Sequence, residues 1–219
     1  MLTNSEIRKK ARRVLEGAWG KAVIVTLIYY VISAGLSASV SIPFGSDLWL
    51  SNGSSMVMTL LCLPLSWGFV VFFLSFVRNQ EKSVGSLFDG YKRFGKVFLT
   101  MFMKNLFILL WTLLLIVPGI MKSMAYAMTE YILLDNSEIS AEDAIHKSRV
   151  MMDGHKMKLF LMYLSFIGWA ILCLFTLGLG FLLLVPYIET SVATFYQDLL
   201  EEQKKADARL NLDQEEPAF

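Results

Sequence analysis

Residues 22–77 read AVIVTLIYYVISAGLSASVSIPFGSDLWLSNGSSMVMTLLCLPLSWGFVVFFLSFV, with no Lys or Arg and with Asp47 as the only acid. A helix needs about 20 predominantly apolar residues to cross the hydrocarbon core of a bilayer. The stretch is too long for one crossing, and it fits two crossings at 22–42 and 56–77 with an outer loop at 43–55. It therefore predicts a membrane-spanning helical hairpin.

The remainder of the chain keeps this apolar character. Hydrophobic residues make up 55% of the 219 residues and charged residues only 18%, whereas soluble domains carry about 25% charged residues. Four more apolar runs predict spans, at 97–117, 120–134, 159–175 and 181–200. The run at 120–134 is short and also fits a re-entrant segment. The expected fold is an all-α membrane protein with about six transmembrane helices, arranged as three helical hairpins.

Two features mark the hairpins and their orientation. Pro118 and Gly119 form a strong turn signal between the third and fourth spans. Of the 20 Lys and Arg residues, 19 fall on one side of the six-span arrangement, and only Lys122 does not. Loops rich in Lys and Arg stay in the cytoplasm. We therefore expect both termini to lie in the cytoplasm. The predicted divisions are an amphipathic helix at 1–21, a membrane domain at 22–200 and a flexible tail at 201–219.

The first 21 residues carry a basic amphipathic pattern. Ile7, Ala11 and Leu15 share one face of a helix, and the basic residues lie largely opposite. Such helices lie in the membrane interface and favour anionic lipid. The alternative is a basic segment that only sets topology. The expected lipid-interface residues are Arg8, Lys9, Arg12, Arg13, Trp19 and Lys21. The net charge of +1 gives no indication of a nucleic-acid partner.

Three predicted cytoplasmic segments lead into the membrane in a similar way. Each has a hydroxyl residue three positions before an acid at its start, at Thr3/Glu6, Ser86/Asp89 and Ser140/Asp143. Each also has an acid followed by Gly shortly before a Lys, at Glu16–Gly17, Asp89–Gly90 and Asp153–Gly154. A hydroxyl caps a helix start, and a left-handed Gly ends a helix. The pattern predicts a threefold repeat, in which each unit is an amphipathic helix followed by a membrane hairpin. The alternative is that helices leading into a bilayer generally need these residue types, without any repeat.

Ionisable residues inside the predicted spans form a candidate polar site, which comprises Glu130, Glu189 and Lys122. Glu189 lies near the middle of its span. Charged groups at this depth are costly, and they usually face a bundle interior or a water-filled path. One interpretation is a proton or cation relay, or a site for a charged headgroup. The other is an ion pair or hydrogen-bond network that only fixes packing.

Several short motifs occur together along the chain: GYKRFG at 90–95, VPGI at 117–120, SAEDAI at 140–145 and SRVMMDG at 148–154. In this combination the chain resembles the bacterial integral membrane proteins grouped as domain of unknown function 975. The resemblance implies a multi-pass protein of the bacterial cytoplasmic (inner) membrane. It transfers no activity, because the family has none assigned.

Motifs of catalysis are not found in the sequence. There is no nucleophile elbow, HExxH, phosphate-binding loop or dinucleotide fingerprint. Neither the cysteines, Cys62 and Cys173, nor the histidines, His146 and His155, predict a metal site. We therefore expect no enzyme, no cofactor and no metal. The expected function is a membrane module that interacts with anionic lipid or with partner proteins, and a homo-oligomer is left open. The alternative is a small transporter or lipid translocator that uses the intramembrane carboxylates.

Overall fold

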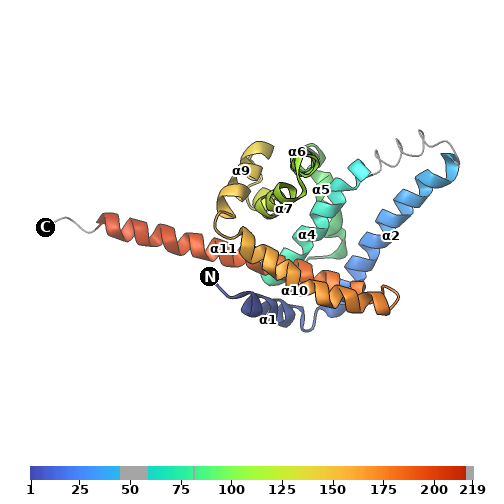
Figure 1. The fold of residues 1–219 in the computed structure, drawn as a ribbon, viewed down its shortest axis with the longest axis horizontal. Coiled ribbons are helices and arrows are strands. Elements are labelled where there is room, and N and C mark those ends of the chain that lie inside the picture. The colour runs from blue at the N-terminus through green and yellow to red at the C-terminus, as the bar shows by residue number, and fades with distance from the viewer. Residues whose placement is uncertain (45–58, 81, 216–219) are drawn as a thin grey trace.

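The computed structural model describes residues 1–44, 59–80 and 82–215, without the side chains of residues 36–44 and 209–215. Within these residues the chain is helical and has no β-strand (Figure 1). The predicted outer loop lies outside the described residues from position 45 onward, as does the predicted start of the second span at 56–58.

The helices differ widely in length. The long ones are α2 (Trp19–Phe44), α4 (Leu63–Val77), α6 (Phe94–Leu114), α10 (Lys156–Phe175) and α11 (Phe181–Glu215). The short ones are α1 (Asn4–Leu15), the 3-10 helix η1 (Val84–Phe88), α5 (Asp89–Lys92), α7 (Ile116–Ala125), α8 (Thr129–Asp135) and α9 (Ala141–Met151).

Three described helices are long and apolar enough to cross a membrane: Thr59–Val77, Phe94–Leu114 and Lys156–Phe175. A fourth is added if α1 and the described part of α2, which are bent by 94°, count as one broken span. The structure therefore supports an all-helical protein with three to four candidate spans.

Helix α4 lies at the centre of the molecule and contacts α2, α6, α8 and α11. In its candidate span 56% of the residues are buried, compared with 17% for α6 and 22% for α10. Two glycines allow close packing here. A Cβ on Gly68 would lie 2.0 Å from the Leu87 carbonyl oxygen, and one on Gly90 would lie 2.3 Å from the Pro64 carbonyl oxygen. As a result, η1 and α5 rest directly on α4.

The predicted hairpin partners are packed pairs, because α2 contacts α4, α6 contacts α7, and α10 contacts α11. The pairs are not parallel to one another. Helices α1, α10 and α11 lie side by side and run across α2 and α4 (Figure 1). The hairpins therefore form crossed layers instead of one bundle with a common axis.

The turn of the second predicted hairpin is displaced from Pro118 and Gly119 to Leu115. The chain reverses at Leu115, whose backbone is extended with φ −158° and ψ 139°, and α7 begins at the next residue. Pro118 falls in the first turn of α7. Backbone N–H groups in the first turn have no acceptor within the helix, so the missing N–H of proline costs no helical hydrogen bond there. Gly119 allows α7 to approach α6, since a Cβ there would lie 2.2 Å from the Thr112 hydroxyl. The Pro118–Gly119 pair therefore marks the start of α7 and its close contact with α6, and not the turn itself.

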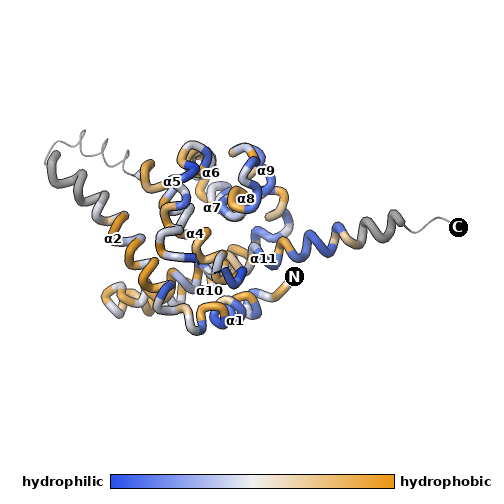
Figure 2. The backbone as a smooth tube through the Cα atoms, turned by 180° about the vertical axis from the view of Figure 1, so that it is seen from behind, coloured by the Kyte–Doolittle hydropathy of each residue, from blue (hydrophilic) through white to orange (hydrophobic). Residues whose placement is uncertain are grey.

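Two other predicted segments also differ from the structure. The predicted span at 120–134 is broken into α7 and α8, of 10 and 7 residues, and neither is long enough to cross a bilayer alone. The predicted flexible tail at 201–219 is helical as far as Glu215, because α11 continues without a break. In Figure 2, α9 and the coloured part of α11 that leads towards the C-terminus are largely polar, whereas the coloured part of α2 and the α10–α11 turn are largely apolar.

Candidate functional site

A buried ion pair joins α6 to α8. Lys104 contacts the carboxylate of Glu130, and their side chains are only 14% and 11% exposed. The indole N–H of Trp67 on α4 donates to the main-chain oxygen of Glu130 over 3.1 Å. Lys104 was not among the residues that the sequence predicted for this site. In the structure it neutralises one of the two candidate carboxylates.

Lys122, the third predicted member of this site, lies elsewhere. Its ammonium group lies over the ring of Trp111, 4.6 Å from the centroid, and 6.0 Å from that of Tyr126. A cation over an aromatic face is stabilised by the ring quadrupole. Within the described residues Lys122 has no carboxylate at ion-pair distance. It is therefore a cation of the α6–α7 hairpin and not a partner of Glu130.

Glu189 on α11 differs from Glu130 because no described residue forms an ion pair or hydrogen bond with its carboxylate. It lines a cavity of about 350 Å³ with Tyr29 and Tyr30 of α2 and Ser66 of α4. Glu189 interacts electrostatically with both Glu130 and Lys104. Four buried oxygens on α8 and α11 have no hydrogen-bond partner among the described residues: Thr129 Oγ1, Glu130 Oε2, Tyr131 Oη and Thr190 Oγ1.

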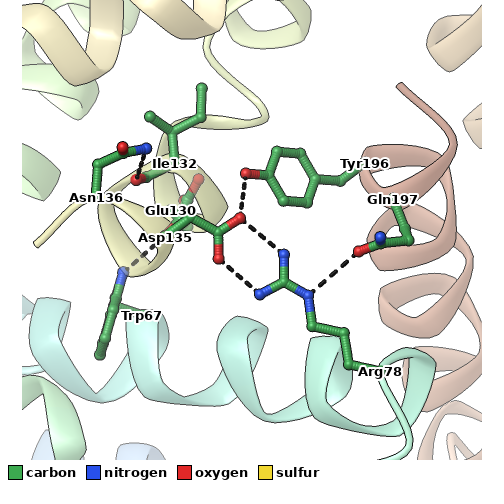
Figure 3. Close-up of polar contacts among 8 residues, drawn as sticks. All are labelled: Trp67, Arg78, Glu130, Ile132, Asp135, Asn136, Tyr196 and Gln197. Carbon is green, nitrogen blue, oxygen red and sulfur yellow. Dashed lines mark hydrogen bonds and ion pairs between the residues drawn. The ribbon is translucent and has the colours of Figure 1, made fainter. Parts of the chain in front are cut away.

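A second polar cluster, the clamp, ties the ends of α4 and α8 to the middle of α11 (Figure 3). Arg78, which ends α4, donates two hydrogen bonds of 2.6 and 2.7 Å to Asp135 at the end of α8. Its Nε donates to Gln197 of α11 over 3.2 Å, and the Tyr196 hydroxyl donates to Asp135 over 2.7 Å. Burial acts to raise the pKa of Asp135, but the hydrogen bonds from Arg78 and Tyr196 outweigh it and hold this pKa below its usual value.

The clamp was missed at the level of sequence, although a signal was present. Arg78 and Asp135 directly follow the predicted second and fourth spans, which end on the same side of the membrane. Opposite charges at such positions can pair across a bundle. The signal is weak on its own because many charges flank membrane spans.

Helix α1 is anchored by its apolar face. Ile7, Ala11 and Leu15 are fully buried, and the helix packs mainly against α11. Thr3 and Glu6 form a capping box at its start, with hydrogen bonds of 2.7 and 3.3 Å. The face that was expected to rest in lipid is therefore covered by protein. The face of α1 that stays exposed is the basic one.

The basic side chains of α1 form no ion pair with any carboxylate that the structure describes. Lys9, Arg12 and Arg13 are exposed, and Arg8 and Lys10 are half-buried. Within the described part of the chain, no carboxylate lies at ion-pair distance from any of the five. Close by, Trp19 opens α2 and is half-buried, and Lys21 is exposed.

The predicted repeat is present in the first and third segments but not in the second. Ser140 caps α9 by accepting from the Asp143 N–H over 3.1 Å, as Thr3 caps α1. Gly17 and Gly154 have φ values of +86° and +77°, which place them in the left-handed region. Each follows the acid of the predicted pair, Glu16 or Asp153, and Asp153 pairs with Lys156 over 3.0 Å.

The second segment uses the same residue types differently. Ser86 lies inside η1, and its hydroxyl donates to the Ser83 carbonyl. Asp89 begins α5 and pairs with Lys92 over 2.8 Å. Gly90 lies in α5, where it permits contact with Pro64. Its role is close packing instead of helix termination.

Comparison with known proteins identifies the family. The family model described as protein of unknown function (DUF975) matches residues 1–122 and 112–203. No curated protein and no solved structure matches the chain. Among the described residues, no group of three or more His, Cys, Asp or Glu is placed to hold a metal ion. Because the two matches together cover nearly all of the described chain, the protein belongs to the DUF975 family of proteins of unknown function.

Proposed function

We propose that this protein is a non-enzymatic, multi-pass membrane module that binds anionic phospholipid headgroups through α1. The observation that carries the proposal is the set of five cations between positions 8 and 13, none of which is paired with a carboxylate in the described residues. These cations are held in place because the opposite face of α1 is buried in the protein core.

Two physical effects favour this function. Each Lys or Arg near an anionic membrane surface contributes about 1 kcal/mol of attraction. A helix already fixed against the protein also loses little conformational entropy on binding. The surface beside α1 is apolar, since Leu172 and Trp169 of α10 are each 57% exposed. Unpaired cations next to exposed apolar side chains are what an anionic amphiphile requires.

For the membrane arrangement we propose six crossings as three hairpins, in the bacterial cytoplasmic membrane and with both termini in the cytoplasm. The distribution of Lys and Arg supports the orientation. The turns of two hairpins are apolar and exposed, with Leu113 at 75% and Leu177 at 96%. The clamp gives further support, because Arg78, Asp135 and Gln197 all lie at predicted cytoplasmic ends of spans.

One contact pattern favours a shallower position for the third hairpin. If α2 crosses the membrane, the 94° bend places α1 near the membrane plane. Helix α11 lies along α1, so the α10–α11 hairpin would lie near that plane as well. The protein would then cross four times, still with both termini inside.

Single cysteines distinguish the two arrangements. They are placed at Asn52, Leu177, Glu138 and Asp213 in a background without Cys62 and Cys173, and intact cells are treated with a membrane-impermeant thiol reagent. Six crossings predict labelling at Asn52 and Leu177 only. Labelling at Asn52 alone would indicate that the third hairpin stays in the inner leaflet. Labelling at Asp213 would contradict both arrangements.

The lipid function is tested with the full chain in nanodiscs. Nanodiscs of phosphatidylcholine alone are compared with nanodiscs that contain about one third phosphatidylglycerol, an anionic lipid. We expect phosphatidylglycerol to raise the thermal midpoint by at least about 2 °C, the shift for roughly 1 kcal/mol of binding in a chain of this size. High salt should reduce the shift, because it screens exposed charges. Equal midpoints in the two lipids would contradict the proposal.

A transporter is the second candidate, favoured by the surroundings of Glu189. Its carboxylate is unpaired among the described residues and lines a cavity of about 350 Å³, together with the hydroxyl-bearing residues Tyr29, Tyr30 and Ser66. Such a cluster suits a proton or a small cation. In proteoliposomes this function predicts a cation or proton flux that Glu189→Gln abolishes without lowering the thermal midpoint. A midpoint that falls, and is restored by a second-site change, would indicate a packing role instead.

A further inference from the structure

A cavity of about 530 Å³ lies between α1, the start of α2 and the α10–α11 hairpin. Its charged part is formed by Arg8 and Arg12 of α1. Its apolar part includes Trp19 of α2, Trp169 of α10, and Leu183 and Leu184 of α11. None of the described residues that line the cavity is acidic. It is therefore positive at one end and apolar at the other.

The charged end is held in a fixed position. The hydroxyl of Tyr187 on α11 donates to the Arg8 carbonyl oxygen over 3.4 Å, which ties this turn of α1 to the hairpin. The Nε of Arg8 is buried and has no hydrogen-bond partner among the described residues. A buried guanidinium N–H without an acceptor is unfavourable unless an anion satisfies it. The neighbouring Arg12 adds a second guanidinium to the same cavity.

The apolar end opens onto a larger apolar surface. Trp169 and Leu183 are 57% and 55% exposed, and Leu172, which follows Trp169 by three residues on α10, is also 57% exposed. Two tryptophans beside two arginines form the combination found at the headgroup level of membranes. A small soluble anion would contact only the charged end. A molecule with an anionic head and hydrocarbon chains would contact both ends.

From this geometry we propose that the cavity binds one anionic phospholipid. Arg8 and Arg12 hold its phosphate by charge-assisted hydrogen bonds. The acyl chains lie along Trp169, Leu183 and Leu184. This inference rests on the proposed lipid function and assigns it to one site: two of the five cations of α1 bind a defined lipid, and the other three contribute only general attraction.

The test uses matched pairs of substitutions on the same helix. Arg8→Gln/Arg12→Gln removes the two cations that line the cavity, and Lys9→Gln/Arg13→Gln removes the same charge outside it. For each variant, the thermal midpoint is measured in nanodiscs with and without phosphatidylglycerol. We expect the cavity pair to lose most of the phosphatidylglycerol-dependent shift and the control pair to keep most of it. Equal losses in both pairs would overturn the site but leave lipid attraction by α1 intact. No shift in the wild type would overturn the lipid function itself.

A second variant keeps the site testable if the cavity pair fails to fold. Leu183→Trp fills the apolar end and leaves every charge in place, at a position that is already 55% exposed. We expect its midpoint in phosphatidylcholine to match that of the wild type and its phosphatidylglycerol shift to be lost. A full shift in Leu183→Trp would show that the acyl chains do not occupy the cavity.

Discussion

The cations that join the core helices are paired with carboxylates, and within the described residues the cations on α1 are not. Lys104 and Arg78 each contact a carboxylate, Glu130 and Asp135, and each pair joins separate helices. The basic residues at positions 8–13 have no carboxylate at ion-pair distance in the described chain. In the core, charge serves to fix the fold. On α1 it remains available for an external anion.

The contrast follows from solvation. A charge removed from water is very unfavourable unless a partner neutralises it, so buried Lys104 requires Glu130. Lys9, Arg12 and Arg13 are exposed, keep their hydration and need no partner, whereas the Nε of Arg8 is buried without a described acceptor. The comparison therefore predicts two separable classes of variant. Changes to the core pairs should lower stability, and changes to α1 should lower lipid binding.

Glu130→Gln should give the largest loss of stability. It removes the partner of Lys104, which is 14% exposed, and leaves the amine charged in the core. Breaking a buried pair on one side destabilises by about 3–5 kcal/mol. The Trp67 bond should survive, because it goes to the main chain of residue 130. The measurement is unfolding in detergent. Lys104→Met/Glu130→Gln should recover much of the loss, and an unchanged midpoint for Glu130→Gln alone would break the comparison.

Asp135→Asn should have a smaller effect. It removes a bidentate partner of Arg78 and the acceptor of the Tyr196 hydroxyl, for a loss of about 1–3 kcal/mol. Because the folded-state pKa of Asp135 is lowered, its contribution is present above the unfolded pKa and is lost as the pH falls through the folded value.

The pH dependence supplies the control for this clamp. Wild-type stability should decline below about pH 4, the ordinary range of an Asp carboxyl. The difference between the wild type and Asp135→Asn should narrow over the same range. A difference that stays constant down to the folded pKa would mean that the ion pair does not stabilise the helix ends.

Part of this architecture was accessible from the sequence. The apolar runs predicted an all-helical chain and the pairs α2/α4, α6/α7 and α10/α11, because hydrophobic length and turn residues are local properties. The crossing of the pairs was not predicted, since it depends on contacts such as Gly68 against Leu87, between residues far apart in the chain. Pro118 was ambiguous because proline both breaks helices and begins them.

The candidate site was predicted only in its residue types. Glu130 and Glu189 were identified because charges inside apolar runs are conspicuous. Their difference was not predictable, since it depends on where Lys104 and Lys122 point: toward Glu130 in one case and over Trp111 in the other. The basic face of α1 was visible from helical periodicity. The burial of its apolar face against α11 was not, because a helical pattern does not identify what covers it.

Thr3→Ala should produce a smaller, local effect. It removes the capping box of α1, for a loss of about 1 kcal/mol. Ser140→Ala should cost about the same at α9, whereas Ser86→Ala should be nearly neutral, because Ser86 caps no helix. Hydrogen exchange at the first turns of α1 and α9 would reveal the fraying. Equal effects at all three positions would restore the threefold repeat.

The smallest effect on stability is expected for the cations of α1, and here lipid retention tests the central claim most directly. The measurement is the ratio of anionic to zwitterionic phospholipid that remains bound to the purified full chain, relative to the ratio in the membrane from which it was extracted. The wild type should be enriched in anionic lipid. A variant with Gln at Arg8, Lys9, Lys10, Arg12 and Arg13 should show no enrichment and a thermal midpoint in detergent close to that of the wild type. Equal enrichment in both proteins, or none in the wild type, would contradict the account.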